Sequence, residues 1–133
     1  MSPNKNTGRG RLVLVVDDYE DTRALAKEIL RRHGFIVAEA ETGEMAIEKA
    51  LKLKPCLVLM DLSLPGIDGR EAARRLKQSP ETRDCRIIAY TALAIREFLD
   101  QAREAGCDSV LTKPCRSAEL VEEITRLLGP TAR

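Results

Sequence analysis

Short apolar runs alternate along this chain with longer segments in which apolar residues recur at helical spacing. The apolar runs, which predict five strands, lie at residues 12–16, 35–38, 57–60, 86–90 and 109–112. The segments with helical spacing, which predict five helices, lie at residues 20–33, 43–53, 69–78, 95–105 and 117–128. Four of the strand segments lack a regular alternation of apolar and polar residues, which is typical of strands covered on both faces.

Residues at the ends of the helical segments indicate where the helices begin and end. Thr42 and Ser117 stand at N-cap positions, where a hydroxyl oxygen can accept a hydrogen bond from a free N–H of the first turn. Gly34 and Gly106 follow the first and fourth segments, at positions where glycine commonly ends a helix.

A strand followed by a helix, repeated five times, predicts a parallel sheet with helices on both faces and right-handed crossovers. Five units are too few for an eight-stranded barrel, so we expect an open, doubly wound sheet. In such a sheet, ligands bind beyond the carboxyl ends of the strands, where the strand order reverses. The residues at those ends are therefore the first candidates for function.

The chain length of 133 residues predicts a single domain. Residues 1–10 are polar and are expected to form a flexible N-terminal tail, while residues 129–133 form a short C-terminal tail. The domain itself is expected at residues 11–128, with no segment left over for an output domain.

The composition argues against several classes of partner. The chain has 22 Lys and Arg residues against 21 Asp and Glu residues, so its net charge of +1 is too small to attract it to nucleic acid or to an anionic membrane. Two Tyr, two Phe and no Trp are too few for a surface that stacks on single-stranded nucleic acid. The apolar runs are far shorter than the ~20 residues of a membrane span, and residues 1–11 lack a signal peptide. We expect a cytoplasmic protein with no membrane insertion and no direct nucleic-acid binding.

The four cysteines have wide and uneven spacings. No CxxC pair occurs, and the single histidine, His33, has no partner at metal-binding spacing, which argues against a zinc site. We interpret the cysteines as small buried or half-buried thiols. Cys56 and Cys85 fall where two strands begin, so a redox role is the alternative.

Charged and hydroxyl side chains follow four of the predicted strands. Asp17 and Asp18 follow the first, Asp61 the third, Thr91 the fourth and Lys113 the fifth. At an assumed ~5 Å and an effective dielectric constant of ~20, each carboxylate pair costs about 3 kcal/mol, so one acid is protonated or a cation joins them. The available ligands are hard oxygens, which favours Mg²⁺.

This set of groups suits phosphoryl transfer, which depends mainly on positioning and charge neutralisation. Asp61 is the best placed nucleophile, because it ends a central strand and is followed by a Pro-Gly loop at residues 62–69. Asp17 and Asp18 would then hold the metal, while Lys113 and Thr91 would contact phosphoryl oxygens.

The segments carrying these residues resemble the receiver domain of two-component response regulators, in the single-domain form of the chemotaxis regulator. The matching segments are LVLVVDD (12–18), LVLMDLSLPGIDG (57–69), IIAYTA (87–92) and LTKP (111–114). The resemblance implies a flavodoxin-like (βα)5 fold, a three-layer sandwich with strand order 2-1-3-4-5. It also implies that a histidine kinase or histidine phosphotransfer protein phosphorylates Asp61, and that the altered surface then signals to a downstream effector protein.

The resemblance further implies the ligands of the site. Asp18, Asp61 and the backbone carbonyl of Ser63 would coordinate Mg²⁺, with Asp17 reaching it directly or through water. Thr91 would move toward the phosphoryl group and Lys113 would bridge to it, next to a cis peptide bond between Lys113 and Pro114. Catalysis would be limited to the domain's own phosphorylation and dephosphorylation.

One position departs from the family pattern. Receiver domains usually carry Tyr or Phe three residues before the lysine, and that ring swings inward when the threonine moves; here the residue is Val110. Tyr90 adjoins Thr91, but side chains alternate along a strand, so it is expected to face the other side of the sheet.

Two alternative functions stay open. The first is a receiver-like interaction module that takes no phosphoryl group. The second is a Mg²⁺-dependent phosphatase of the haloacid dehalogenase type, although that class needs an acid two residues after the first Asp, where this chain has Tyr19. The basic residues of helix 69–78 are interpreted as a solvated face, with docking to an acidic partner as the alternative.

Overall fold

The computed structural model describes residues 11–64, 66–92, 96–113 and 115–129. Strands and helices alternate along the chain as β1 (Leu12–Val16), α1 (Glu20–Arg32), β2 (Ile36–Ala40), α2 (Gly43–Leu53), β3 (Leu57–Met60), α3 (Gly69–Gln78), β4 (Arg86–Thr91), α4 (Arg96–Glu104), β5 (Ser109–Thr112) and α5 (Ser117–Leu128). The strands form one sheet in the order β2-β1-β3-β4-β5, and every neighbouring pair is parallel. The predicted flavodoxin-like fold and strand order are confirmed.

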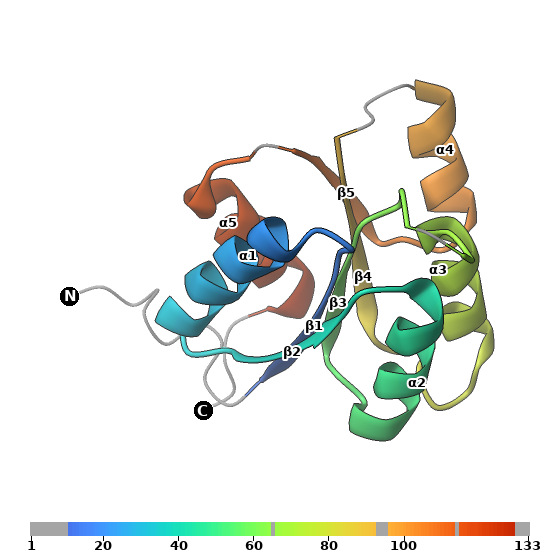
Figure 1. The fold of residues 1–133 in the computed structure, drawn as a ribbon, viewed down its shortest axis with the longest axis horizontal. Coiled ribbons are helices and arrows are strands. Elements are labelled where there is room, and N and C mark those ends of the chain that lie inside the picture. Colours follow the sequence, from blue (N-terminus) through green and yellow to red (C-terminus); the bar gives the residue numbers. More distant parts are fainter. Residues whose placement is uncertain (1–10, 65, 93–95, 114, 130–133) are drawn as a thin grey trace.

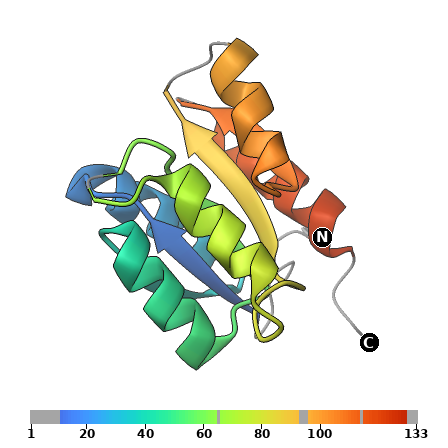
Figure 2. The ribbon, with the colours of Figure 1, turned by 90° about the vertical axis from the view of Figure 1, so that its right-hand side faces the viewer.

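The helices cover both faces of this sheet. Helices α1 and α5 lie on one face, and α2, α3 and α4 lie on the other (Figure 1). The same layers are visible in the perpendicular view (Figure 2). Alternate residues along each strand therefore enter two separate cores: in β4, Ile87 and Ala89 pack on the α2–α3–α4 side, whereas Ile88 and Tyr90 pack on the α1–α5 side. This double burial explains the nearly continuous apolar strands.

Two strands differ from the prediction in where they begin or end. The second strand begins at Ile36 rather than residue 35, because the backbone N–H of the buried Phe35 donates to the Leu30 carbonyl and belongs to the turn after α1. It continues to Ala40, since Glu39 and Ala40 pair with Val15 and Val16. Strand β4 likewise extends to Thr91, one residue beyond the prediction. These extensions carry the ladder to the edge where the polar residues lie.

The helix-end predictions are correct at three of four positions. Thr42 Oγ1 accepts a hydrogen bond from the Met45 N–H at 3.1 Å, and Gly34 and Gly106 adopt φ values of 90° and 103°, which L side chains rarely adopt. The Ser117 cap is wrong. Ser117 is the first residue of α5, and the N-cap is Arg116, whose backbone N–H donates to the Glu119 carboxylate at 2.9 Å.

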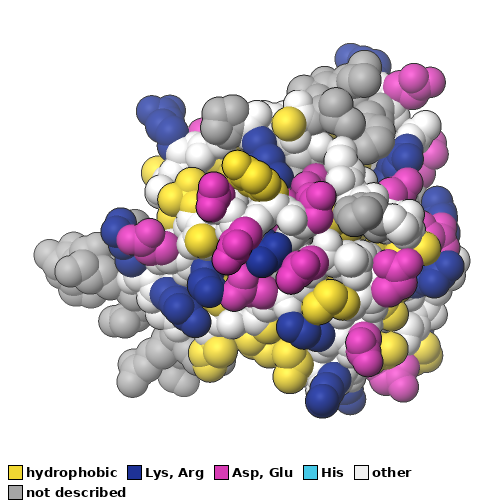
Figure 3. Space-filling model, viewed as in Figure 1, with side chains coloured by type: hydrophobic (Ala, Val, Ile, Leu, Met, Phe, Trp, Pro, Cys, Tyr) yellow, Lys and Arg dark blue, Asp and Glu magenta, His cyan; other side chains and the backbone are white. Residues whose placement is uncertain are grey.

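The basic residues of α3 are paired with acids. Arg74 and Arg75 both contact Glu71, and Lys77 Nζ lies 3.0 Å from Asp108 Oδ2. Arg70 likewise pairs with an acid, Asp68. Side chains of both signs are also interspersed over the face shown in Figure 3. These pairs support the interpretation of α3 as a solvated helix face. Within the described residues, no helix has the length and apolar character needed to cross a bilayer.

Candidate functional site

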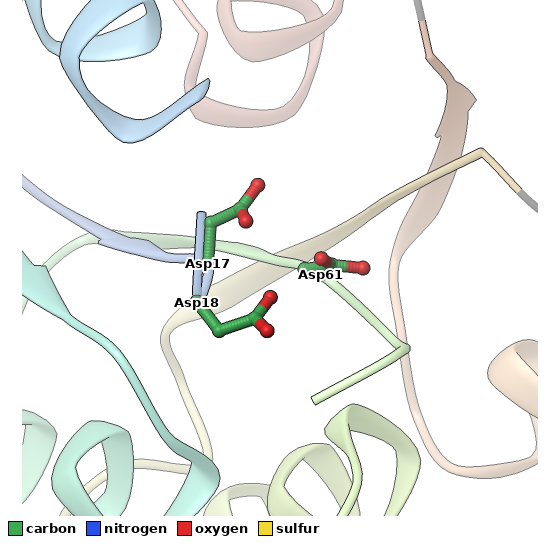
Figure 4. A group of neighbouring side chains, drawn as sticks. All are labelled: Asp17, Asp18 and Asp61. Carbon is green, nitrogen blue, oxygen red and sulfur yellow. The ribbon is translucent and has the colours of Figure 1, made fainter. Parts of the chain in front are cut away.

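The three predicted acids meet at the carboxyl edge of the sheet because the ladder continues past the ends of β1 and β3. The Asp17 N–H donates to the Ala40 carbonyl at 3.1 Å, and the Asp61 N–H donates to the Val16 carbonyl at 2.9 Å. Asp17 and Asp18 therefore leave one strand directly beside Asp61 on the next (Figure 4). One carboxylate oxygen from each lies within 4.8 Å of the others.

The acids differ in their exposure. Asp17 and Asp61 are 3% and 7% exposed, whereas Asp18 is exposed at the rim. Burying two carboxylates side by side is unfavourable unless donors or cations compensate them. The structure provides those donors from three segments of the chain.

Asp17 and Asp61 share one cation. Lys113 Nζ lies 2.6 Å from Asp17 Oδ2 and 3.4 Å from Asp61 Oδ2. Each acid also accepts a backbone hydrogen bond from two residues further on: Tyr19 N–H to Asp17 Oδ1 at 2.9 Å, and Ser63 N–H to Asp61 Oδ1 at 3.0 Å. These contacts fix both carboxylates in position before any ligand arrives.

Burial raises the pKa of Asp61 above its ordinary value, and the neighbouring charge of Asp17 raises it further. The Ser63 N–H and the Lys113 ammonium act in the opposite direction, because both stabilise the ionised form. A divalent cation would remove much of the remaining repulsion. The donor set fits Mg²⁺, since, among the described residues, it consists of three carboxylates whose ligand oxygens lie close to one another.

Thr91 and Lys113 reach the same edge from β4 and from the end of β5. Thr91 is fully buried, and its carbonyl accepts a hydrogen bond from the Lys113 N–H at 2.8 Å, which ties the two segments together. All five predicted side chains thus lie at one edge. Ser63 is placed there through its N–H, while Pro114 and its peptide bond lie outside the described residues.

The comparisons with known proteins decide the family. Residues 13–125 match the family model of the response regulator receiver domain. This chain belongs to the receiver domain family. The assignment places it in two-component signalling, as a receiver of the CheY and DivK type.

Two curated relatives are similar to this receiver over nearly their whole length. The chemotaxis protein CheY of Bacillus subtilis is 36% identical over 118 residues, which covers 88% of this chain and 97% of CheY. The polar-differentiation response regulator DivK of Brucella anthropi is 31% identical over 117 residues, which covers 88% of this chain and 95% of DivK.

Solved receiver structures share the fold. A response regulator from Chloroflexus aurantiacus superposes with a TM-score of 0.86 at 32% identity, covering 90% of this chain and 98% of the other. The receiver domain of the sensor histidine kinase PA1611 of Pseudomonas aeruginosa has a TM-score of 0.85 at 31% identity, with the same coverages. The latter is described with a magnesium ion coordinated in its active-site cleft.

In this receiver, Val110 and Tyr90 lie on opposite faces of the sheet. Val110 packs on the α2–α3–α4 side of the sheet, and Tyr90 packs on the α1–α5 side. The sequence did not reveal a further contact: Lys113 Nζ lies 5.3 Å from the centroid of the Tyr90 ring, within cation–π range. Tyr90 therefore touches the site through the lysine.

Sequence reasoning also missed two charged residues behind Asp17. Arg23 of α1 is buried and donates to the Asp17 carbonyl, and it pairs with Glu39 of β2. Two signals could have identified them. Arg23 shares a helical face with the buried residues Ala26 and Leu30, and Glu39 is an acid within a strand that is otherwise apolar.

The thiols match the interpretation as small buried groups. Cys85 and Cys107 are buried, Cys56 and Cys115 are half-buried, and all four are unpaired by disulfide bonds. Cys56 and Cys85 precede β3 and β4 at neighbouring positions, as the register of Leu57 with Arg86 requires. Burial raises the pKa of all four thiols, so they are less nucleophilic than free cysteine.

Proposed function

We propose that this receiver accepts a phosphoryl group on Asp61 and signals through the resulting change in its surface. The observation that carries the proposal is the position of the Asp61 carboxylate. It is buried at the carboxyl edge, Lys113 lies 3.4 Å from Oδ2, and the Ser63 N–H orients Oδ1. One acceptor oxygen is thus held beside a cation that can bind the incoming group.

The transfer needs a donor with a labile phosphoryl group, such as the phosphohistidine of a histidine kinase or of a histidine phosphotransfer protein. An Asp61 oxygen forms the new bond to phosphorus as the bond from phosphorus to the donor nitrogen breaks, and that nitrogen takes up a proton. The protein's contribution is to position the carboxylate and to neutralise charge. Lys113 and the Thr91 hydroxyl would contact the oxygens of the transferred group.

Asp17, Asp18, Asp61 and the carbonyl of Ser63 are the proposed Mg²⁺ ligands. A bound Mg²⁺ would offset the charge that accumulates on the phosphoryl oxygens during transfer. The relationship to the magnesium-containing receiver of PA1611 supports this assignment, as does the convergence of the three acids. Lys113 would then move from Asp17 toward the phosphoryl group.

The phosphorylated receiver would signal by binding other proteins and would not catalyse a reaction on a separate substrate. Its own catalysis would be limited to acceptance of the phosphoryl group and its later hydrolysis. The output would be binding to a downstream effector protein. Membership of the receiver family favours this function over the phosphatase alternative. The presence of each acid and of Lys113 favours it over an interaction module that is never phosphorylated.

Incubation with acetyl phosphate and Mg²⁺, followed by intact-mass measurement, tests the proposal. The wild type is expected to gain the mass of one phosphoryl group, and Asp61→Ala is expected to gain none. Asp84→Asn is the matched control, because Asp84 is an exposed aspartate before β4, at the opposite edge of the sheet. Equal labelling of the wild type and Asp61→Ala would refute the proposal.

A further inference from the structure

Arg23 connects three elements beside the acidic site. It lies on α1, its Nη1 donates to the Asp17 carbonyl at 2.9 Å, and its Nε donates to Glu39 Oε1 of β2 at 3.1 Å. Only 11% of its side chain is exposed. A buried guanidinium of this kind is unfavourable without partners, and here both partners are fixed parts of the sheet edge.

Glu39 provides a rigid anchor for this connection. It pairs with Val15 in the parallel ladder, so its backbone is fixed relative to β1. Its other oxygen accepts a hydrogen bond from Lys27 Nζ at 2.7 Å, so two cations of α1 hold one carboxylate. The pKa of Glu39 is lowered, chiefly by its hydrogen bond to Lys27, with Arg23 contributing in the same direction.

Arg23 completes the set of contacts that fix Asp17. Lys113 holds Asp17 Oδ2, the Tyr19 N–H holds Oδ1, and Arg23 holds the main-chain carbonyl. The carbonyl of Asp17 belongs to the peptide bond that continues to Asp18. Its orientation therefore influences the direction in which the exposed Asp18 carboxylate leaves the strand.

We propose that Arg23, anchored by Glu39, is a positioning residue that orients Asp17 and Asp18 for divalent-cation binding. The inference rests on the proposed function of this site. A planar guanidinium can donate in two directions from fixed positions, and the ammonium of a lysine lacks that fork. Loss of a group that orients a metal ligand typically weakens metal binding by about 10–100-fold.

Lys27 offers a matched control on the same helix. Lys27 and Arg23 both pair with Glu39, but the structure records a hydrogen bond to Asp17 from Arg23 and, among the described residues, none from Lys27. Arg23→Met and Lys27→Met remove the same charge near the site. A purely electrostatic role would raise Mg²⁺ affinity in both variants, because each loses a cation that repels the metal.

The test is a titration of the purified protein with Mg²⁺, followed through the amide NMR shifts of Asp17, Asp18 and Tyr19. Arg23→Met is expected to bind Mg²⁺ about 10-fold more weakly than the wild type, whereas Lys27→Met is expected to bind it at least as tightly as the wild type. Arg23→Lys, which keeps the charge, is expected to be weakened as well. It serves as the decisive variant if Arg23→Met is unfolded in metal-free buffer.

Wild-type affinity in a folded Arg23→Met or Arg23→Lys protein would overturn the inference, as would equal effects of the Arg23 and Lys27 substitutions. This failure can be told apart from failure of the proposed function. If the wild type itself binds no Mg²⁺ and takes no phosphoryl group, the function is wrong. If the wild type does both and only the Arg23 variants are unaffected, the inference alone is wrong.

Discussion

The ammonium group of Lys113 lies 2.6 Å from Asp17 Oδ2, in a pair whose acid is almost completely buried. The distance from the same nitrogen to the proposed acceptor, Asp61, is longer at 3.4 Å. In this structure, the lysine therefore compensates a neighbouring acid more closely than it contacts the acceptor. A cation that binds Asp17 would release Lys113 for the phosphoryl group.

Replacement of Lys113 by methionine is expected to destabilise the metal-free protein. The substitution leaves the buried Asp17 carboxylate without its cation, and loss of one partner from a buried pair costs about 3 kcal/mol. The measurement is urea unfolding. Lys77→Met is the control, because Lys77 is about as exposed as Lys113, but its partner Asp108 is less buried than Asp17 and retains contacts with Arg86 and the Ile87 N–H. An equal or smaller loss for Lys113→Met would contradict this account of the pair.

Asp61 is expected to lower the stability of the metal-free protein at neutral pH. Its pKa is raised on folding, mainly by burial, so the folded state binds the proton more tightly than the unfolded state. The stability gained from protonation is fully present below the unfolded pKa and is lost as pH rises through the higher folded pKa. Asp61→Asn should therefore be more stable than the wild type at neutral pH, and the difference should shrink toward pH ~4.

Unfolding of both proteins in metal-free buffer across this pH range measures the effect. Asp18→Asn is the control, since Asp18 is exposed and is expected to show a smaller gain. A wild type that is more stable than Asp61→Asn at neutral pH would show that Lys113 and the Ser63 N–H outweigh burial.

The buried thiols are expected to resist modification in the folded protein. Burial raises the pKa of Cys85 to about 11 and that of Cys107 to about 12, so almost no thiolate forms at mildly alkaline pH. Reaction with a disulfide reagent should be slow at these two residues and should become complete in denaturant. Rapid labelling of Cys107 without unfolding, located by peptide mass, would contradict the structure.

Activation is expected to change the surface of α4, β5 and α5 only slightly. Val110 occupies the position where receivers usually have an aromatic ring, and a branched aliphatic side chain has no comparable rotamer swing. Amide NMR shifts with and without beryllofluoride and Mg²⁺ measure this. Small changes at the surface of these elements are expected. A large rearrangement there would show that another residue, with Tyr90 beneath Lys113 as the first candidate, has taken over the coupling.

The fold could be predicted because its signals are local and mutually consistent. Apolar strands such as Leu57–Met60, helical spacing and parallel topology leave few arrangements, and the strand ends then bring Asp17, Asp61 and Lys113 together. The pairing of Lys113 with Asp17 could not be predicted in this way. It depends on the path that the long Lys113 side chain takes at the edge of the sheet.

Arg23 and Glu39 show a second limit of sequence reasoning. Each lies in an element whose pattern is explained by packing, and their connection spans 16 residues. Only the tertiary arrangement shows that the Arg23 guanidinium reaches the Asp17 carbonyl. The Ser117 cap failed for a related reason, because the Glu119 side chain satisfies the backbone one residue earlier.

The central claim, that Asp61 carries the phosphoryl group, is tested most directly by trapping the modified residue. After phosphorylation in the presence of Mg²⁺, borohydride reduces an aspartyl phosphate to homoserine, and peptide sequencing by mass spectrometry locates it. The account predicts homoserine at position 61 in the wild type and none in protein treated without Mg²⁺. Homoserine at the position of another aspartate would contradict the account. So would the absence of homoserine after incubation with a phosphoryl donor of verified activity.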